Sequence, residues 1–235
     1  SAVGDGAGGE TNAGLVTQMI DGWNPDLFLY LGDVYDKGTY PEFYNWYGTS
    51  TVDYGRFRDV TNPAIGNHEY ENGVAPGYFQ YWNNVPNYYS YNAGGWHFIA
   101  LNSTSEYNQT STTSPQYQWL VGDLAANTAP CTLAYWHHPI LSTGPQGDTP
   151  RMNDMWSALV QAGTDLVLTG HDHSYQRWKP LDANLNFSPS GATHIVSGAG
   201  GHGVQGAVRS DDRLAVMFGN PANSYGASYF KLNPK

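Results

Sequence analysis

The sequence predicts an α/β protein, and two kinds of pattern support that fold class. Short apolar runs end at polar residues, often after a glycine, as buried strands do, and amphipathic helical patterns lie between several of them. The clearest run covers residues 166–168 and leads through Gly170 to His171 and His173. Because ligands bind at the carboxyl ends of strands in open α/β sheets, these two histidines are candidate ligand residues.

Four other strand-like runs end at residue types that bind metal ions: Asp5, Asp33, Asn67 with His68, and His137 with His138. Each has an ordinary alternative, since histidine is common in hydrogen-bonded cores and an amide beside an imidazole is common in turns. Five strand ends that all deliver Asp, Asn or His are harder to attribute to packing. Oxygen and imidazole donors suit hard or borderline metal ions, so the pattern favours a metal site.

The first half of the chain alternates short strands with helical segments. A glycine-rich loop at residues 6–10 lets the backbone approach a ligand closely, although a plain strand-to-helix turn has the same composition. Residues 26–32 form an almost continuous apolar run, as in a strand covered on both faces. The expected elements are, in order, a strand ending at residue 4, a helix capped by Thr11 or Asn12, a strand at 26–32, a helical turn at 41–47 and a strand at 62–66.

The second half contains the clearest helix, because apolar residues recur at helical spacing over residues 152–160. His97 alternates with apolar neighbours and is expected to be structural. His202 follows a strand within a second glycine-rich loop, where it either lines a pocket or is solvated. The expected elements are a hairpin at 88–103, a helix from Ser114, a strand at 132–136, the helix at 152–160, strands at 166–168 and 193–197, and an edge strand at 227–232.

Length and composition predict a single domain that spans residues 1–235. No linker, charge block or internal repeat divides the 235 residues, and a hydrophobic content of 40% is enough for a full core. Charged residues make up only 13%, a composition that suits a secreted protein. Because the chain opens almost inside its first strand, we expect that upstream sequence, including a signal peptide, has been removed.

The charge balance excludes some partners. The net charge is −10, which repels phosphate backbones, so we expect no tracking along nucleic acids. No apolar run is long enough to span a membrane, and the lone Cys131 excludes an internal disulfide. Bound divalent ions would supply the positive charge that the side chains lack.

The ordered set from Asp5 to the Gly170–Ser174 motif GHDHS resembles the calcineurin-like metallophosphoesterases. Within them, the segments GRFRDVTNPAIGNHEY, YWHHP and GHDHSYQR are most similar to the purple-acid-phosphatase branch and its secreted microbial members. The resemblance implies a four-layer α/β sandwich. In that fold two mixed β-sheets pack face to face between helices, with a dinuclear metal site at the carboxyl ends of the strands.

The resemblance also implies a role for each residue. Two metal ions, iron paired with zinc, manganese or a second iron, would activate a hydroxide for in-line attack on a small phosphomonoester or phosphodiester. Asp33 would bridge the ions, and His68 would act as a catalytic group rather than a ligand. Asp5 and His173 would hold the first ion. Asn67, His137 and His171 would bind the second ion. Asn67, His68 and His202 would contact the substrate.

The sequence departs from the family pattern near the first ion. Ala7 stands where relatives outside this branch have a histidine, and Asp36 stands where the purple branch has its tyrosine. The tyrosine, Tyr35, comes one residue early. Either Tyr35 still binds the first ion, which then is ferric iron in a coloured protein, or Asp36 or water takes its place and the ion is divalent.

A second class of function is a non-catalytic carbohydrate or cell-wall binding domain on the same scaffold, suggested by an aromatic content of 14%. Aromatic residues that line the mouth of a site would bind sugars or aryl groups, whereas the same residues in a core would be structural. The aromatic residues concerned are Tyr78, Phe79, Tyr81 and Trp82. The nearly complete ligand set favours the hydrolase, because a scaffold that had lost catalysis is expected to lose ligands.

Overall fold

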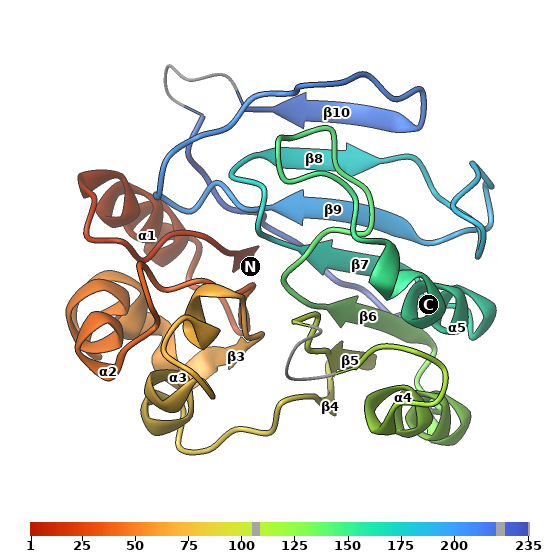
Figure 1. The fold of residues 1–235 in the computed structure, drawn as a ribbon, viewed down its shortest axis with the longest axis horizontal. Coiled ribbons are helices and arrows are strands. Elements are labelled where there is room, and N and C mark those ends of the chain that lie inside the picture. Colours follow the sequence, from red (N-terminus) through yellow and green to blue (C-terminus); the bar gives the residue numbers. More distant parts are fainter. Residues whose placement is uncertain (105–108, 220–223, 235) are drawn as a thin grey trace.

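Two β-sheets form the centre of the structure, and helices cover their outer faces (Figure 1). The computed structural model describes residues 1–104, 109–219 and 224–234. Each strand sends alternate side chains to opposite faces, which is why one strand serves two hydrophobic layers. On β2 (Phe28–Tyr30), for example, Phe28 and Tyr30 pack under the helices, while Leu29 packs between the sheets. The four-layer α/β sandwich expected from the sequence is therefore confirmed.

The larger sheet has seven strands in the order β10-β8-β9-β7-β6-β5-β4. Its centre is parallel, from β5 through β6 and β7 to β9, and the remaining pairings are antiparallel, so the sheet is mixed. The strands are β4 (Tyr89–Ala93), β5 (Trp96–Ala100), β6 (Cys131–Tyr135), β7 (Leu166–Thr169), β8 (Tyr175–Trp178), β9 (Thr193–Ser197) and β10 (Leu214–Phe218).

The smaller sheet contains β1 (Ala2–Val3), β2 and β3 (Thr61–Pro63), and its named strands all run parallel. In the part of the chain that the structure describes, its antiparallel component is a single bridge between Ala2 and Ser228. An edge strand was expected at 227–232, but the structure has only this bridge there. The prediction of a strand over the whole segment was therefore wrong. A strand needs a continuous ladder, and only one residue of the segment pairs with β1.

The helices divide between the two outer faces (Figure 1). Those of the first half lie beside the small sheet, and α4 and α5 lie beside the large one. The helical turn expected at 41–47 is a short helix continued by a π-helical turn. The α-helices are α1 (Thr11–Trp23), α2 (Tyr40–Glu42), α3 (Pro76–Tyr81), α4 (Pro115–Ala126) and α5 (Asn153–Gln161), and the other turns are η1 (Phe43–Tyr47), η2 (Asp53–Val60), η3 (His68–Tyr70) and η4 (Pro150–Met152).

Two local expectations, the helix that begins at Ser114 and the structural role of His97, are confirmed. Ser114 caps α4 by accepting a hydrogen bond from the Tyr117 amide. His97 is buried and structural, with its ring nitrogens 2.7 Å from Asn92 Oδ1 and 2.7 Å from Asp123 Oδ2. Among the described residues, no helix is long and apolar enough to cross a membrane.

Candidate metal centre

The carboxyl ends of five strands, drawn from both sheets, meet at one place. Hydrogen bonds tie the strand ends together: Gly4 N, just after β1, donates to Ser197 O at the end of β9 at 2.9 Å, and Gly170 N donates to His137 O at 2.9 Å. Three residues at these ends have left-handed backbones: Asp5 (φ 59°), Asp33 (φ 67°) and His171 (φ 69°). Such conformations cost about 1–3 kcal/mol for a non-glycine residue and are concentrated at functional sites.

One cluster of donor atoms surrounds His137 Nε2. Asn67 Oδ1, His171 Nδ1 and Asp33 Oδ2 each lie 3.1 Å from it. Its other ring nitrogen, Nδ1, donates to the Leu31 carbonyl at 2.8 Å, which leaves Nε2 facing the cluster as the atom that can bind a metal ion or carry a second proton. Two imidazole nitrogens this close cannot both be bare acceptors, so a proton or a cation must join them.

Asp33, His137 and His171 each offer one ligand atom, and these atoms all lie within 4.8 Å of one another. The donor set is imidazole nitrogen with carboxylate and amide oxygen, which fits zinc, manganese or iron. We call Asn67, His137 and His171 the second cluster.

The first cluster consists of Asp5, Tyr35 and His173. The Tyr35 hydroxyl lies 2.9 Å from His173 Nε2 and donates to Asp5 Oδ1 at 3.1 Å. Asp36, in contrast, is exposed, and it contributes its backbone amide to Glu42 and its backbone carbonyl to His68. The structure thus brings Tyr35 to the first cluster despite its shifted position in the sequence.

Asp33 touches both clusters. Its Oδ2 atom lies 3.1 Å from His137 Nε2 and 3.4 Å from the Tyr35 hydroxyl, while Oδ1 accepts from the His68 amide at 3.0 Å. A carboxylate placed between two donor sets is suited to bridging two ions, as expected for this residue.

Burial and neighbouring charges shift the pKa values of the candidate ligands. Burial raises the pKa of Asp5 well above its ordinary value. Burial also disfavours the charged forms of Asp33 and His137, but their mutual attraction wins: it holds the pKa of Asp33 far below its ordinary value and raises the pKa of His137 to about 9. Burial lowers the pKa of His171 to about 3, so this ring is held neutral, as a metal ligand must be.

Glu69 has a structural role that the sequence alone did not assign. Its buried carboxylate accepts hydrogen bonds from the backbone amides of Asp33 (3.2 Å), Val34 (2.7 Å) and Gly66 (2.7 Å). Burial raises the pKa of Glu69 to about 7. Gly66 is required here, because a Cβ atom on it would overlap Asp33 Oδ1. The signal was present in the sequence, since Glu69 closes the motif GNHE.

Tyr30 joins the loops that carry Asp5 and Asp33. Its buried hydroxyl donates to Asp33 O at 2.7 Å and accepts from the amides of Gly6 (3.4 Å) and Ala7 (3.3 Å). No sequence signal marks this role, because Tyr30 is one more apolar residue in a strand.

Three further histidines surround the two clusters. His68 Nε2 lies 3.9 Å from Asp33 Oδ2, and its ring meets that of Tyr35 at a centroid distance of 4.4 Å. His202 stacks on Tyr35, with the ring centroids 3.7 Å apart, which places its ring beside the first cluster. His138 is buried beside the rings of the second cluster, and its Nδ1 lies 2.8 Å from Ser103 Oγ.

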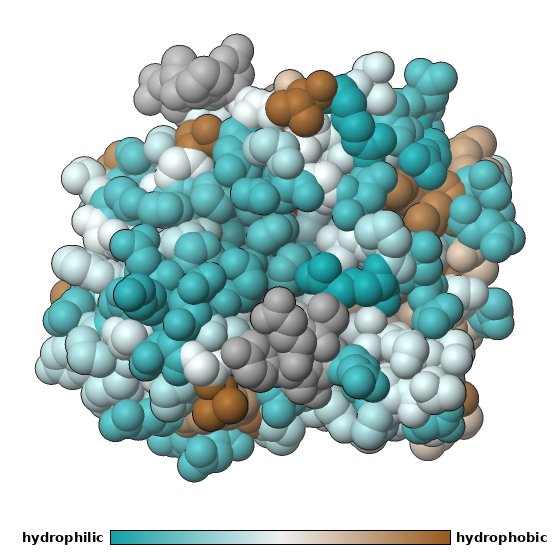
Figure 2. Space-filling view, viewed as in Figure 1, coloured by the Kyte–Doolittle hydropathy of each residue, from teal (hydrophilic) through white to brown (hydrophobic). Residues whose placement is uncertain are grey.

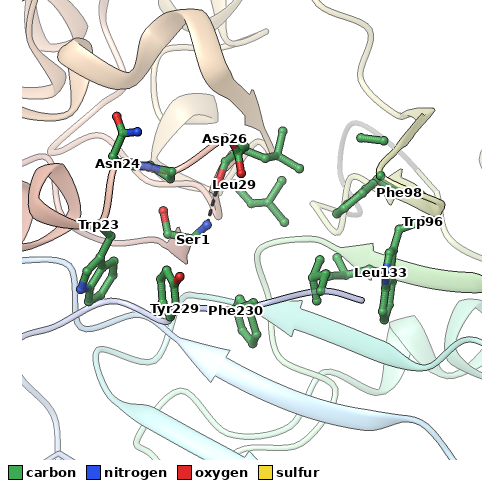
Figure 3. A pocket seen from close by; sticks show the side chains of 15 residues that line it. Ser1, Trp23, Asn24, Asp26, Leu29, Trp96, Phe98, Leu133, Tyr229 and Phe230 are labelled. Atoms are coloured by element: carbon green, nitrogen blue, oxygen red, sulfur yellow. Dashed lines mark hydrogen bonds between the residues drawn. The ribbon is translucent and has the colours of Figure 1, made fainter. Parts of the chain in front are cut away.

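An apolar cavity of about 270 Å³ lies elsewhere, at the amino ends of β2 and β5 (Figure 3). Trp23, Trp96, Tyr229 and Phe230 line it, and none of the candidate ligands does. The face drawn in Figure 2 is mostly hydrophilic, with apolar residues scattered.

The aromatic residues considered as a binding platform are structural. Tyr78 and Tyr81 are buried in the core beneath the small sheet, where Phe79 and Trp82 pack against them.

A family model described as calcineurin-like phosphoesterase matches residues 10–175. Purple acid phosphatase 15 of Arabidopsis thaliana is 29% identical over 233 residues, an alignment that covers 80% of this chain and 42% of that protein. Purple acid phosphatase 13 of the same plant is 35% identical over 154 residues, covering 63% of this chain and 27% of that protein. The chain therefore spans less than half the length of these curated relatives.

Solved structures share the fold. Purple acid phosphatase PPD1 from yellow lupin (Lupinus luteus) seeds has a TM-score of 0.73 at 17% identity, covering 94% of this chain and 47% of that one. GAP50, described as the anchor in the inner membrane complex of Plasmodium, has a TM-score of 0.67 at 14% identity, covering 94% of this chain and 77% of that one. PhoD has a TM-score of 0.64 at 10% identity, covering 96% of this chain and 62% of that one.

Proposed function

Because the chain belongs to the calcineurin-like phosphoesterase family, we propose that it hydrolyses small phosphoric esters at a dinuclear metal site. The observation that carries the proposal is the convergence of two donor clusters on Asp33, with donor atoms from both sheets. Phosphomonoesters and phosphodiesters are the candidate substrates.

The residues present fit two metal ions. Asp5, Tyr35 and His173 would hold the first ion, and the second cluster would hold the second, with Asp33 shared between them. When bound, the two ions supply an activated hydroxide nucleophile and a positive clamp for the phosphoryl group. Iron paired with zinc, manganese or a second iron suits this mixture of oxygen and nitrogen donors.

His68 is suited to protonate the leaving group. Its Nδ1 lies 2.6 Å from the Asp36 carbonyl, which can only accept, so Nδ1 carries a proton and donates. The other nitrogen, Nε2, is then the one that can face substrate, and it can give up a proton when the ring is an imidazolium. The ring is partly exposed, with 31% of the side chain accessible, so substrate can reach it.

Asn67 and His202 complete the proposed substrate contacts. The Asn67 amide oxygen faces His137, which leaves its NH₂ group available to donate to a phosphate oxygen. The His202 side chain is 31% exposed beside the first cluster, within reach of a group bound there.

The alternative, a non-catalytic binding domain, loses its main support because the aromatic residues that suggested it are buried in the core or packed against it. GAP50 is described as an anchor, so the fold by itself does not identify an enzyme. The donor set therefore carries the proposal. The low content of charged residues, 13%, also favours an extracellular location, which fractionation of the source cells would test.

The test is hydrolysis by metal-loaded protein across aryl monophosphates, aryl diesters and nucleotides. We expect close to two metal ions per chain, and Asp33→Asn should lose both metal and activity, since one carboxylate serves both ions. Asp59→Ala, which removes an exposed carboxylate in η2, is the matched control and should retain both. Full activity in protein stripped of metal by a chelator would refute the proposal.

A further inference from the structure

Two glycine-rich loops meet beside the first cluster. One follows β1 and ends at Glu10, and the other follows β9 and contains His202. The His202 ring nitrogen Nδ1 is hydrogen-bonded to Glu10 Oε1, and the His202 amide donates to Asp5 O at 3.0 Å. The pair therefore connects the second loop to the loop that carries a candidate ligand.

Gly8 leaves room for the Glu10–His202 contact. A Cβ atom at this position would lie 2.5 Å from Glu10 Oε2 and 2.8 Å from His202 Nδ1, distances that real Cβ atoms essentially never show. The glycine-rich composition after Asp5, which first suggested a close backbone approach to a ligand, thus has a second explanation. It leaves space for a pair of side chains.

His202 in turn contacts Tyr35. The two rings are stacked, with centroids 3.7 Å apart and an interplanar angle of 22°. Tyr35 is 3% exposed, and its hydroxyl lies 2.9 Å from His173 Nε2 and 3.1 Å from Asp5 Oδ1. Glu10, His202 and Tyr35 therefore form a chain of contacts from the glycine-rich loop to the first cluster.

We propose that Glu10 and His202 are positioning residues, which hold the Tyr35 ring so that its hydroxyl stays at the first cluster and strengthens binding of the first ion. This inference rests on the proposed dinuclear site. The hydrogen bond to Glu10 fixes the orientation of the His202 ring, and the stacked ring restricts Tyr35. A ligand already held in its bound orientation loses less conformational freedom when the ion binds.

The experiment measures metal affinity in competition with a chelator, for wild type, four test variants and one control variant. Glu10→Ala and His202→Ala should weaken binding of the first ion by about 10–100-fold, the usual effect of losing a residue that orients a ligand, and leave the second ion unchanged. Glu10→Gln can still accept a hydrogen bond, and His202→Phe can still stack, so each should lose less than its alanine counterpart. Asp59→Ala controls for the loss of a negative charge.

A double-mutant cycle identifies the route of the effect. In a Tyr35→Phe background, His202→Ala should cause less than about a twofold further loss of affinity, because the group it positions is gone. A full further loss, or unchanged affinity in both alanine variants, would overturn the inference. Thermal unfolding of the metal-free variants checks that each is folded, and the two conservative variants remain informative if an alanine variant is not.

The outcome is separable from that of the proposed function. A wild-type protein that binds two ions but hydrolyses no phosphate ester would refute the proposed reaction, and the affinity comparison would still decide the positioning role. A wild-type protein that binds no metal would overturn both.

Discussion

Tyr30→Phe removes one oxygen atom and leaves the ring packing in place. The lost hydroxyl makes one short hydrogen bond, to Asp33 O at 2.7 Å, and two long ones, from Gly6 N at 3.4 Å and Ala7 N at 3.3 Å. A net contribution of about 1 kcal/mol for the short bond, plus a penalty for buried groups left without partners, gives a loss of about 2 kcal/mol in the free energy of unfolding.

The more specific effect of Tyr30→Phe concerns the metal site. The hydroxyl holds the loops of Asp5 and Asp33 together, so its loss should weaken metal binding by about 10–100-fold. Tyr47→Phe is the matched control. Tyr47 packs against Tyr30 in the same core, with ring centroids 4.8 Å apart, but among the described residues its hydroxyl makes a single hydrogen bond, of 3.4 Å, with Thr61.

Urea denaturation of the metal-free proteins measures the first effect, and chelator competition measures the second. We expect Tyr47→Phe to lose less than about 1 kcal/mol and to keep its metal affinity. Equal metal affinities for the two variants would refute the idea that the Tyr30 hydroxyl organises the site.

Three further predictions concern single residues. His68→Ala should keep its metals and lose about 10²–10⁴-fold in rate, more for poor leaving groups than for nitrophenolate; loss of metal would instead identify His68 as a ligand. Iron-loaded protein should show a visible phenolate-to-iron band that Tyr35→Phe abolishes, and a band that survives the substitution would exclude Tyr35. Burial lowers the pKa of His194 from 6.5 to about 3, so the unfolded chain binds a proton in this range that the folded chain does not. The contribution of His194 to the free energy of unfolding should be complete above pH 6.5 and fall by about 1.4 kcal/mol per pH unit toward pH 3. Urea denaturation at several pH values should find this slope in the wild type and not in His194→Gln. The same slope in both proteins would show that the buried ring is not its cause.

Much of the centre was readable from the sequence because its ligands follow strands directly. A buried strand is a local pattern, and the carboxyl ends of neighbouring parallel strands share one edge of a sheet, so His137 and His171 could be placed together without knowing any side-chain contact. Asp33 follows a strand of the other sheet, and only the family resemblance placed it with them. The choice between Tyr35 and Asp36 could not be made in this way. It depends on the path of a loop between two strands, which adjacent residues alone do not determine.

Contacts between distant segments were also beyond sequence reasoning. β8 and β10 pair across a long connection, and their short runs carry little periodicity of their own, so neither strand was predicted. Tyr30 and Glu10 have ordinary sequence contexts, and their roles follow from what lies opposite them in the folded chain. The prediction of a strand at 227–232 was wrong for the opposite reason. The local pattern is typical of a strand, but only Ser228 pairs with a neighbouring strand, through Ala2.

The left-handed backbones at Asp5, Asp33 and His171 set stability against function in this protein. Glycine would relieve the strain at any of the three positions, but each replacement would remove a side chain that the centre needs. A search for thermostable variants that scores only folding would therefore select against the metal centre. Such a search should hold these three positions fixed and look for stability on the exposed faces of the helices instead.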